Sequence, residues 1–481
     1  MPRADCGDRG LQIVGVAALL LSCTARPVDI PDTAVAPPPP PLPDLSSAPD
    51  MPPPPRPQHN AQGWISSFGP KAYLTDARLD HDGNVYLYGT YKGDTVINHD
   101  KLTAPAPYDV QLLVAKAGPD GAALWGIAAS NAPMGSVDPA GMAVDTEGNI
   151  YITGKFSGIV SFGSHTRTST ENGDMFLARV SAQGTVDWAV SAGGDGIYND
   201  VGSVVAVSPT GTVLVAGRVT GKAAFGSVTI QSTSPIAFIA AYESVTGKLL
   251  WVDETAPLGG NMHDNRIAAI AARAGGFYVA GRFCNQVSIG GQVVKALKGL
   301  SGVYLASVTE TGTVEWLTEV LSTTDLGEVN VGGIATDGDG NIYVTGRSET
   351  AYVVAGQAPM KPVFLIKTSS TGVVQWSAHP NGPSYTGVGL QALKNGGADW
   401  ALTNKEYARV DAFGDVVPLT EVMEHGVLGL VHLGCAADGC RYIGNCGEDT
   451  AAPGTFTALG MQVTRNGTIC ILNRYADGPG H

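Results

Sequence analysis

One pattern recurs along most of this chain, and its period limits the folds that the chain can adopt. Each copy contains a glycine followed four residues later by a tryptophan. These tryptophans are Trp125, Trp188, Trp251, Trp316 and Trp376, so successive copies are 63, 63, 65 and 60 residues apart. A second marker, an apolar segment that ends in glycine, keeps the same period at Gly89, Gly154, Gly217, Gly281 and Gly346. Two independent markers with one period indicate a repeat architecture.

Each repeat is predicted to contain four short strands. In the second copy these are 141–144, 150–156, 175–180 and the segment that carries Trp188. The first two are joined by an Asp-x-x-Gly-Asn turn, whose residue types favour hairpins. Charged residues make up only 15% of the chain and no sustained helical period of apolar residues occurs, which argues against helices. Four short antiparallel strands per unit, repeated radially, predict an all-β propeller.

The repeats count to seven blades over residues 63–481. Five copies are clear, a sixth is shortened, and the seventh ends before its fourth strand. The missing strand is expected at the other end of the repeat region, where residues 63–67 resemble a fourth strand with no blade before it. We therefore expect the Trp64 strand to pair with the strand that ends near Tyr475. The ring of four-stranded antiparallel blades would then be closed by an N-terminal outer strand in its last blade.

The N-terminal segment has the features of a secretory signal. Leu11 to Leu21 is an apolar run that suits a signal peptide and is too short to span a bilayer. It ends Leu20-Leu21-Ser22-Cys23, which resembles a bacterial lipobox. The resemblance implies that residues 1–22 are removed and that Cys23 is lipidated. An ordinary signal peptide with a chance cysteine is the alternative.

The segment from 23 to 62 is predicted to be a disordered linker that separates the lipid anchor from the propeller. It contains the proline runs 37–41 and 52–55 and almost no large apolar residues. Such a segment cannot bury a core and populates an extended polyproline conformation. Thr24 follows the cysteine, so the aspartate that retains lipoproteins at the inner membrane is missing. We expect an outer-membrane lipoprotein that faces the periplasm or the cell surface.

The two markers together resemble a known bacterial repeat. Asp-x-x-Gly-Asn-Ile/Val-Tyr-x-x-Gly combined with Gly-x-x-x-Trp is similar to the SBBP repeat of seven-bladed β-propellers. The resemblance covers about residues 63–478 and is closest in the first, second and fifth copies. It implies an extracytoplasmic propeller and carries no catalytic residues. Residues 247–251 also resemble the tryptophan-docking motif of PQQ-type propellers, but no inward-facing ligands for the quinone are identified.

Four polar residues recur seven or eight residues before the turn of their repeats. They are Asp138, Asp200, Asp264 and Asn330. In a propeller this spacing places them where the innermost strand begins, at the mouth of the central channel. A carboxylate ring there could bind a cation or a polar ligand. The alternative, which we favour, is that these side chains accept hydrogen bonds from exposed backbone N–H groups.

Two acidic turns resemble the start of a calcium-binding loop. They are Asp80 to Asn84 and Asp337 to Asn341. Calcium takes about six to eight oxygen ligands, and the glutamate that would complete the loop is replaced by Tyr91 in one copy and Ser348 in the other. Because the same slot is a hairpin turn in every repeat, we favour a turn. No cofactor is expected, and Ca²⁺ is the one alternative.

The cysteines gather in the seventh blade. Cys435, Cys440, Cys446 and Cys470 lie there, and Cys284 is left over and expected to be buried. In an oxidising compartment we expect disulfides Cys435–Cys440 and Cys446–Cys470 to join strands where the ring closes. A zinc site made from the same four residues is the alternative.

Charge and motifs restrict the function. The formal net charge is -14 and no Lys/Arg-rich run occurs, so nucleic acid is not an expected partner. No hydrolase, metalloprotease or phosphate-binding motif is present. Our first hypothesis is a monomeric, non-enzymatic binding scaffold tethered to the membrane, contacting protein or glycan through the loops at 130–139, 192–200, 254–265 and 321–330. The alternatives are a lyase or hydrolase acting on polysaccharide, and a component of outer-membrane protein assembly.

Overall fold

The computed structural model describes the repeat region with gaps. The described residues are 64–67, 72–80, 82–93, 95–97, 100–102, 110–118, 123–131, 135–170, 172–257, 265–296, 301–325, 327–354, 363–379, 387–392, 397–402, 407–410, 412–413, 416–418, 427–436, 439–446, 461–462 and 468–474. The predicted signal segment, the Pro-rich linker with Cys23, and Asp264 lie outside them. None of the described residues forms a helix long and apolar enough to cross a membrane.

The strands form consecutive four-stranded antiparallel units, named here sheets 1 to 7. Sheet 1 contains β2 (Ala72–Leu79), β3 (Val85–Lys92), β6 (Val110–Ala117) and β7 (Ala123–Asn131). Sheet 2 contains β8 (Ser136–Val144), β9 (Ile150–Ser157), β12 (Asp174–Val180) and β13 (Val186–Ala192). Sheet 3 contains β14 (Val201–Val207), β15 (Thr212–Phe225), β16 (Val228–Glu243) and β17 (Leu249–Pro257). Sheet 4 contains β18 (Arg266–Arg273), β19 (Gly276–Cys284), β22 (Ser301–Thr309) and β23 (Val314–Thr323).

The remaining sheets repeat this order. Sheet 5 contains β24 (Val329–Thr336), β25 (Ile342–Ser348), β27 (Val363–Thr368) and β28 (Val374–Ala378). Sheet 6 contains β29 (Gly387–Ala392), β30 (Ala398–Leu402), β31 (Tyr407–Val410) and β32 (Val416–Pro418). Sheet 7 contains β33 (Val427–Ala436), β34 (Gly439–Cys446), β36 (Thr468–Arg474) and, from the other end of the chain, β1 (Trp64–Ser67).

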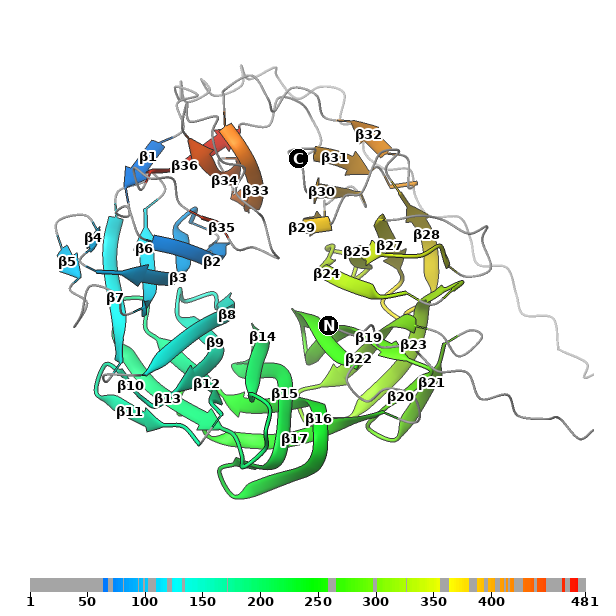
Figure 1. Ribbon diagram of the computed structural model, residues 1–481. Coiled ribbons are helices and arrows are strands. Elements are labelled where there is room, and N and C mark those ends of the chain that lie inside the picture. The colour runs from blue at the N-terminus through cyan, green and yellow to red at the C-terminus, as the bar shows by residue number, and fades with distance from the viewer. Residues whose placement is uncertain are drawn as a thin grey trace, which may run out of the picture. The chain divides into compact units, whose positions relative to one another are not determined.

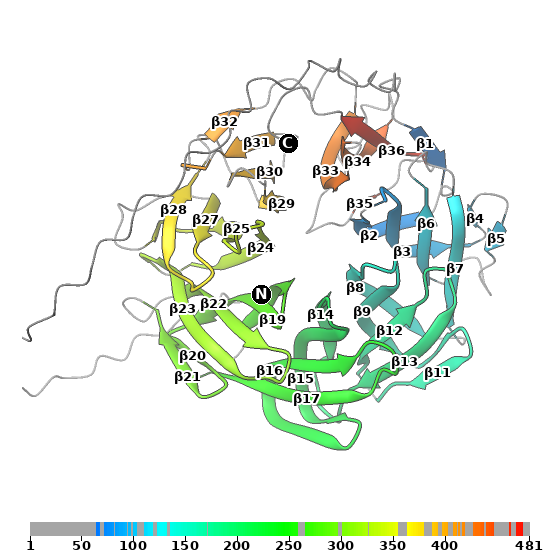
Figure 2. The same ribbon diagram turned by 180° about the vertical axis from the view of Figure 1, so that it is seen from behind.

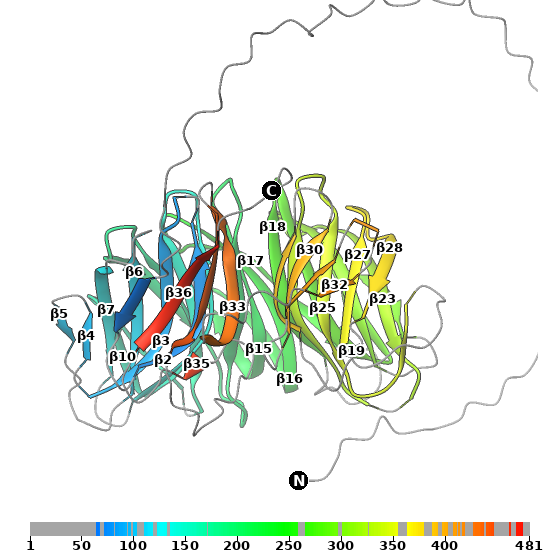
Figure 3. The ribbon, with the colours of Figure 1, turned by 90° about the horizontal axis from the view of Figure 1, so that it is seen from above.

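The sheets are arranged radially (Figures 1 and 2). The first strand of each sheet lies innermost and contacts the first strand of the next, in the order β2, β8, β14, β18, β24, β29 and β33. In turn β33 contacts β2. Seen from the side, the strands run between the two faces of this arrangement (Figure 3). The all-β propeller expected from the sequence is therefore confirmed.

Sheet 7 combines strands from both ends of the repeat region. Its outer strand β1 pairs with β36, with Trp64 opposite Ile471. Cys435 in β33 lies directly opposite Cys440 in β34, and directly opposed residues have Cα atoms about 4.5–5.5 Å apart, within the reach of a disulfide. The two disulfides and the zinc alternative stay predictions, which mass spectrometry of the unreduced protein would separate. Cys284 is buried, as expected.

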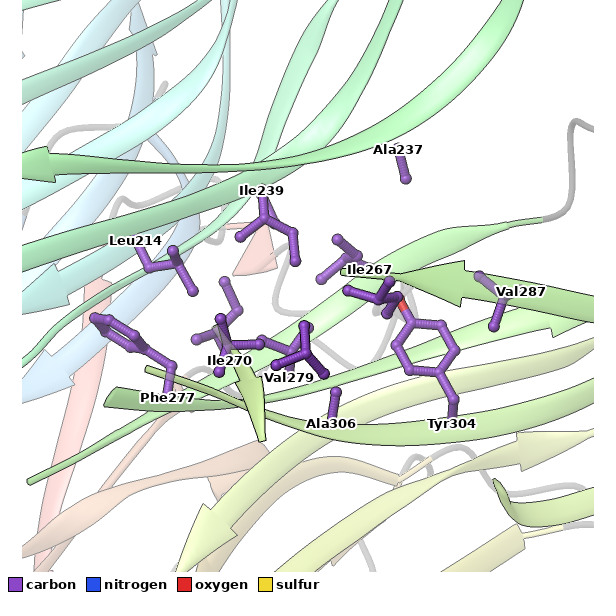
Figure 4. Close-up of a cluster of buried hydrophobic side chains, with 14 of the residues drawn as sticks. Leu214, Ala237, Ile239, Ile267, Ile270, Phe277, Val279, Val287, Tyr304 and Ala306 are labelled. Carbon is purple, nitrogen blue, oxygen red and sulfur yellow. The ribbon is translucent and has the colours of Figure 1, made fainter. Parts of the chain in front are cut away.

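Apolar side chains fill the spaces between neighbouring sheets. Between sheets 3 and 4, Leu214 and Ile239 face Ile270, Phe277 and Val279 (Figure 4). Full burial of one such side chain stabilises a protein by about 1.5–3 kcal/mol. Sheets 2 to 5 each contribute buried side chains to clusters shared with both neighbouring sheets, so none of these four completes its core alone.

The tryptophans dock each sheet onto the next. The Trp188 indole N–H donates to the carbonyl oxygen of Ser244 at 2.9 Å, and Trp125 donates likewise to Ala182 at 3.0 Å. Each ring lies over the turn glycine of the following repeat: a Cβ at Gly247 would stand 2.7 Å from Trp188 Cδ2. The regular tryptophans therefore serve packing between blades, which was the interpretation favoured over sugar stacking.

Short segments from one repeat also cover the outer strand of the repeat before it. These segments are β10 (Ile159–Phe162), which pairs with β7; β20 (Gln286–Ile289), which pairs with β17; and β26 (Tyr352–Val353), which pairs with β23. The partner strands β11 (His165–Thr168) and β21 (Gln292–Lys295) complete two of these hairpins. Two further short strands pair as β4 (Thr95–Ile97) with β5 (Asp100–Leu102), and β35 (Met461–Gln462) pairs with β2. The two residues of each outer strand that are paired in this way are not available to pair with another chain.

Candidate anion-binding site

A β-bulge recurs at one position of the innermost strands. The extra residues are Thr75, Ala140, Ser203, Ala268 and Gly332, each opposite a gap in the register with the second strand. A bulge re-aims the side chains around it and is common beside functional sites. The residues before the bulge therefore pair with the second strand in the same register in all five sheets.

Basic side chains occupy one register position in the second strand. The position directly follows the glycine that served as the second sequence marker, and it holds Lys155, Arg218, Arg282 and Arg347 in sheets 2 to 5, with Thr90 in sheet 1. The residues opposite them on the innermost strand are Asp138, Val201, Arg266 and Asn330. Sequence analysis missed this set, although Gly-Lys or Gly-Arg recurs in four copies.

Two of these cations contact acceptors of the protein itself. Lys155 Nζ lies 2.8 Å from Asp138 Oδ2. The buried Arg282 guanidinium lies 2.9 Å from Glu328 Oε2 and donates to Asn330 Oδ1 at 3.0 Å. Hydrogen bonding and charge from Arg282 lower the pKa of the Glu328 carboxyl below its usual value. These two cations are therefore already paired.

Arg218 stands in a different setting, at the boundary between sheets 3 and 4. No hydrogen bond or ion pair with a described residue engages its guanidinium group. It lines a cavity of about 210 Å³ that is walled by Val201, Ser203, Gly217, Arg218, Asn265, Arg266 and Ile267. Ile267 also belongs to the core cluster between these sheets, so the cavity is built on a packed interface (Figure 4).

The polar groups that line this pocket are mostly donors. Arg218 and Arg266 supply guanidinium groups, and Ser203 supplies a hydroxyl from the bulge. Asn265 is 8% exposed, and its Oδ1 accepts from the backbone N–H of Cys284 at 3.2 Å. Its Nδ2 is buried and has no acceptor among the described residues. Guanidinium groups bind carboxylates and phosphates strongly, so the arrangement suits an anion.

Asp200 precedes the pocket residue Val201, and its carboxylate accepts hydrogen bonds from the backbone. It is 1% exposed, and its two oxygens accept from the N–H groups of Gly194 at 2.8 Å and Thr220 at 2.7 Å. Burial raises its pKa to about 7; the two hydrogen bonds and the charge of Arg218 oppose that rise. This is the backbone-accepting role that the sequence analysis favoured.

The predicted polar residues do not occupy equivalent positions. Asp138 and Asn330 share one register position in sheets 2 and 5, whereas Asp200 lies one residue before the equivalent Val201. Both Asp138 and Asn330 are exposed at the start of their strands and contact a cation. Each of the three described residues thus accepts from a group of the protein.

The comparisons with known proteins concern the same repeats. Residues 131–155 and 316–349 match the SBBP family, described as "Beta-propeller repeat". These two segments are copies of that propeller repeat. No curated protein sequence matches it.

Solved propellers are similar to this chain at low identity. BamB from Moraxella catarrhalis is 12% identical with a TM-score of 0.34, over 86% of this chain and 99% of that one. The quinohemoprotein alcohol dehydrogenase from Comamonas testosteroni is 11% identical with a TM-score of 0.43, over 86% and 77%. The Dos1 propeller is 8% identical with a TM-score of 0.44, over 86% and 96%.

The acidic turns of the repeats are closed by their own hydrogen bonds. Asp337 accepts from the backbone N–H of Asn341 at 2.8 Å, from Asn341 Nδ2 at 2.8 Å and from the Tyr343 hydroxyl at 3.0 Å. Asp80 and Asp145 make the same contacts in their own repeats. The favoured interpretation of this slot as a hairpin turn is confirmed. Among the described residues no group of three His, Cys, Asp or Glu side chains could hold a metal ion.

The matched SBBP regions exclude the pocket. They contain the innermost strand and the turn of sheets 2 and 5, β9 up to Lys155, the whole of β25 with Arg347, and most of β23 in sheet 4. The pocket residues all lie between 201 and 267. The pocket therefore lies between the two matched regions.

Proposed function

We propose that this protein is an extracytoplasmic binding scaffold that holds an anionic ligand at the channel face of its propeller. The observation that carries the proposal is the pocket between sheets 3 and 4. Arg218 and Arg266 place two positive charges in one small cavity, and the buried Asn265 Nδ2 adds a donor. The chain as a whole carries a net charge of -14, so the protein does not attract anions over long range. An anionic ligand would instead be recognised by direct contact with the positive charges of this pocket.

The composition of the pocket supports binding rather than catalysis. Glycosidases need paired carboxylates, and lyases need a general base within reach of the substrate. The residues that line the described pocket are Val, Ser, Gly, Arg, Asn and Ile, none of which is an ordinary acid or base near neutral pH. The adjacent Asp200 is buried with both oxygens engaged by backbone N–H groups.

The scaffold in this proposal is a seven-bladed ring closed by β1. The pairing of β1 with β36 and the contact of β33 with β2 support it, because both join the two ends of the repeat region. Disulfides among Cys435, Cys440, Cys446 and Cys470 would reinforce the same blade. Residues 23–62 would act as a spacer of up to about 120 Å between the membrane and the ring, at about 3.1 Å per residue.

The tether at Cys23 has a direct test. Cells that express the full-length protein are grown with a labelled fatty acid, and incorporation is measured after immunoprecipitation. We expect label in the wild type and none in Cys23→Ser, because the thiol is the acceptor of the lipid. Label that persists in Cys23→Ser would refute the anchor, and a known lipoprotein in the same cells checks the labelling.

Binding without turnover tests the scaffold. Purified full-length protein is mixed with dye-labelled polygalacturonate, polyglutamate, dextran sulfate and neutral dextran, and both retention and polymer length are measured. We expect at least one anionic polymer to be retained with unchanged length, and binding to weaken with added salt because exposed charges are screened. Retention of none of the anionic polymers would refute the proposal. Shortening of a polymer would instead support the lyase or hydrolase alternative.

A further inference from the structure

We propose that the pocket between sheets 3 and 4 binds the carboxylate of one acidic sugar unit within a glycan. The inference rests on the proposed function and names the ligand class of that site. It depends on three features of the described residues: the pairing of the basic positions, the free donor of Asn265 and the size and rim of the cavity.

The repeat itself shows where a negative charge is missing. At the equivalent register position, Lys155 faces Asp138, and the two form an ion pair. Arg218 faces the apolar Val201 instead, and in the next sheet the facing residue is the basic Arg266. Among the described residues, the one opposite Arg218 therefore carries no carboxylate, and both oxygens of the nearby Asp200 are engaged by backbone N–H groups. Arg266, whose charge also acts on Glu328, adds a second cation to the pocket. A ligand carboxylate would take the place that Asp138 has in sheet 2.

The buried amide of Asn265 supplies a specific donor. Asn265 is more than nine-tenths buried and lines the pocket, and its Oδ1 is held by the Cys284 backbone N–H. This contact fixes the side-chain amide, so that Nδ2 is left without an acceptor among the described residues. A buried donor without an acceptor costs stability. A bound oxygen would satisfy it.

The size and rim of the pocket suit a sugar. A cavity of about 210 Å³ is smaller than the clefts of about 300–1,000 Å³ that hold drug-sized ligands, so it takes one unit of a longer chain. Val201 and Ile267 provide an apolar wall for the C–H groups of a sugar ring. Tyr198 and Ile197 are exposed in the loop that leads into β14, next to the pocket in sequence. Exposed aromatic side chains can pack against the C–H groups of a sugar ring.

Calorimetry with small probes tests this inference. Full-length protein is titrated with a galacturonic acid trisaccharide, the neutral galactose trisaccharide of the same linkage, a triglutamate peptide and inorganic phosphate. We expect the uronate to bind at least 10-fold more tightly than each of the other three probes. Arg218→Ala should weaken uronate binding by about 10- to 100-fold, the usual range for a lost hydrogen bond to a charged group.

Two further variants make the result specific. Asn265→Asp keeps the acceptor for the Cys284 N–H but replaces the Nδ2 donor by an oxygen, so it should also weaken uronate binding by at least 10-fold. Arg347→Ala removes a cation at the same register position outside the pocket, and binding should stay within about 2-fold of the wild type. Thermal unfolding of each variant verifies that it is folded.

Each contrary outcome has its own meaning. Equal or tighter binding of triglutamate would identify an acidic peptide ligand, and equal binding of phosphate a general anion site; both overturn the acidic sugar. Uronate binding that Arg218→Ala and Asn265→Asp leave unchanged would overturn the pocket. If no small probe binds while anionic polymers are still retained, this inference fails and the scaffold proposal stands.

Discussion

Replacement of Gly247 by alanine should destabilise the protein by about 1–3 kcal/mol more than the same replacement at Gly275. Both glycines have positive φ, at 69° and 75°, so both variants carry a similar backbone strain of about 1–2 kcal/mol. Their surroundings differ. A Cβ at Gly247 would stand 2.7 Å from Trp188 Cδ2, whereas no described atom lies within 4 Å of a Cβ at Gly275. The additional cost is that of overpacking, typically about 1–3 kcal/mol.

Removal of the Trp188 ring tests whether its collision with the new Cβ causes the cost of Gly247→Ala. Trp188→Ala alone should cost about 3–5 kcal/mol, because Trp188 is 6% exposed and its indole N–H is bonded to Ser244. In the Trp188→Ala background the difference between Gly247→Ala and Gly275→Ala should vanish, since the colliding ring is gone. Denaturant unfolding of the full-length variants measures all of these free energies. Equal effects of the two glycine variants in the wild-type background would show that Trp188 does not dock on Gly247.

These contacts explain why the repeat could be predicted from sequence but its contacts could not. Gly184 and Trp188 are four residues apart and define one marker, yet they serve different interfaces. Gly184 receives Trp125 from the sheet before, and Trp188 reaches Gly247 in the sheet after. A period in the sequence indicates that units are equivalent, but it does not indicate which unit a side chain contacts.

The candidate site shows a second limit. The spacing before the turn grouped Asp200 with Asp138, and the structure separates them by one register position. Loop lengths vary by one residue between copies, and in a strand a shift of one residue moves a side chain to the opposite face. The basic residue directly follows the marker glycine in each copy. Aligning the copies on this glycine places the basic residues correctly, because no loop lies between the two.

Pairing between distant segments was also beyond the sequence. The segment 159–162 forms β10 and pairs with β7 of the preceding sheet. Ile159, Val160 and Phe162 are strand formers, but the pairing partner lies about 30 residues away in the chain. Local propensity does not reveal such a partner, since strand preference depends mainly on the neighbours that the fold supplies.

The stability of the protein should fall between about pH 4 and pH 7 through the titration of Asp200. Burial raises the pKa of this carboxyl from 3.8 to about 7, so the folded state binds the proton more readily than the unfolded state does. The contribution is fully present below about pH 4 and is lost as the pH rises through 7. The slope at intermediate pH is at most about 1.4 kcal/mol per pH unit, which sums to a few kcal/mol.

Asp200→Asn isolates this contribution from the rest of the protein. Asp76 and Asp174 also have pKa values raised by burial, so the wild-type curve alone contains their effects. The asparagine does not titrate and offers one oxygen to the two N–H groups of Gly194 and Thr220, which should cost about 1–3 kcal/mol at pH 5. The deficit of the variant should narrow or reverse by pH 8, because only the wild type must then bury a charge. Unfolding free energies of the wild type and of Asp200→Asn, measured at both pH values, test this prediction. A difference between the two proteins that stays the same at pH 5 and pH 8 would mean that the pKa of Asp200 is near its ordinary value despite its burial.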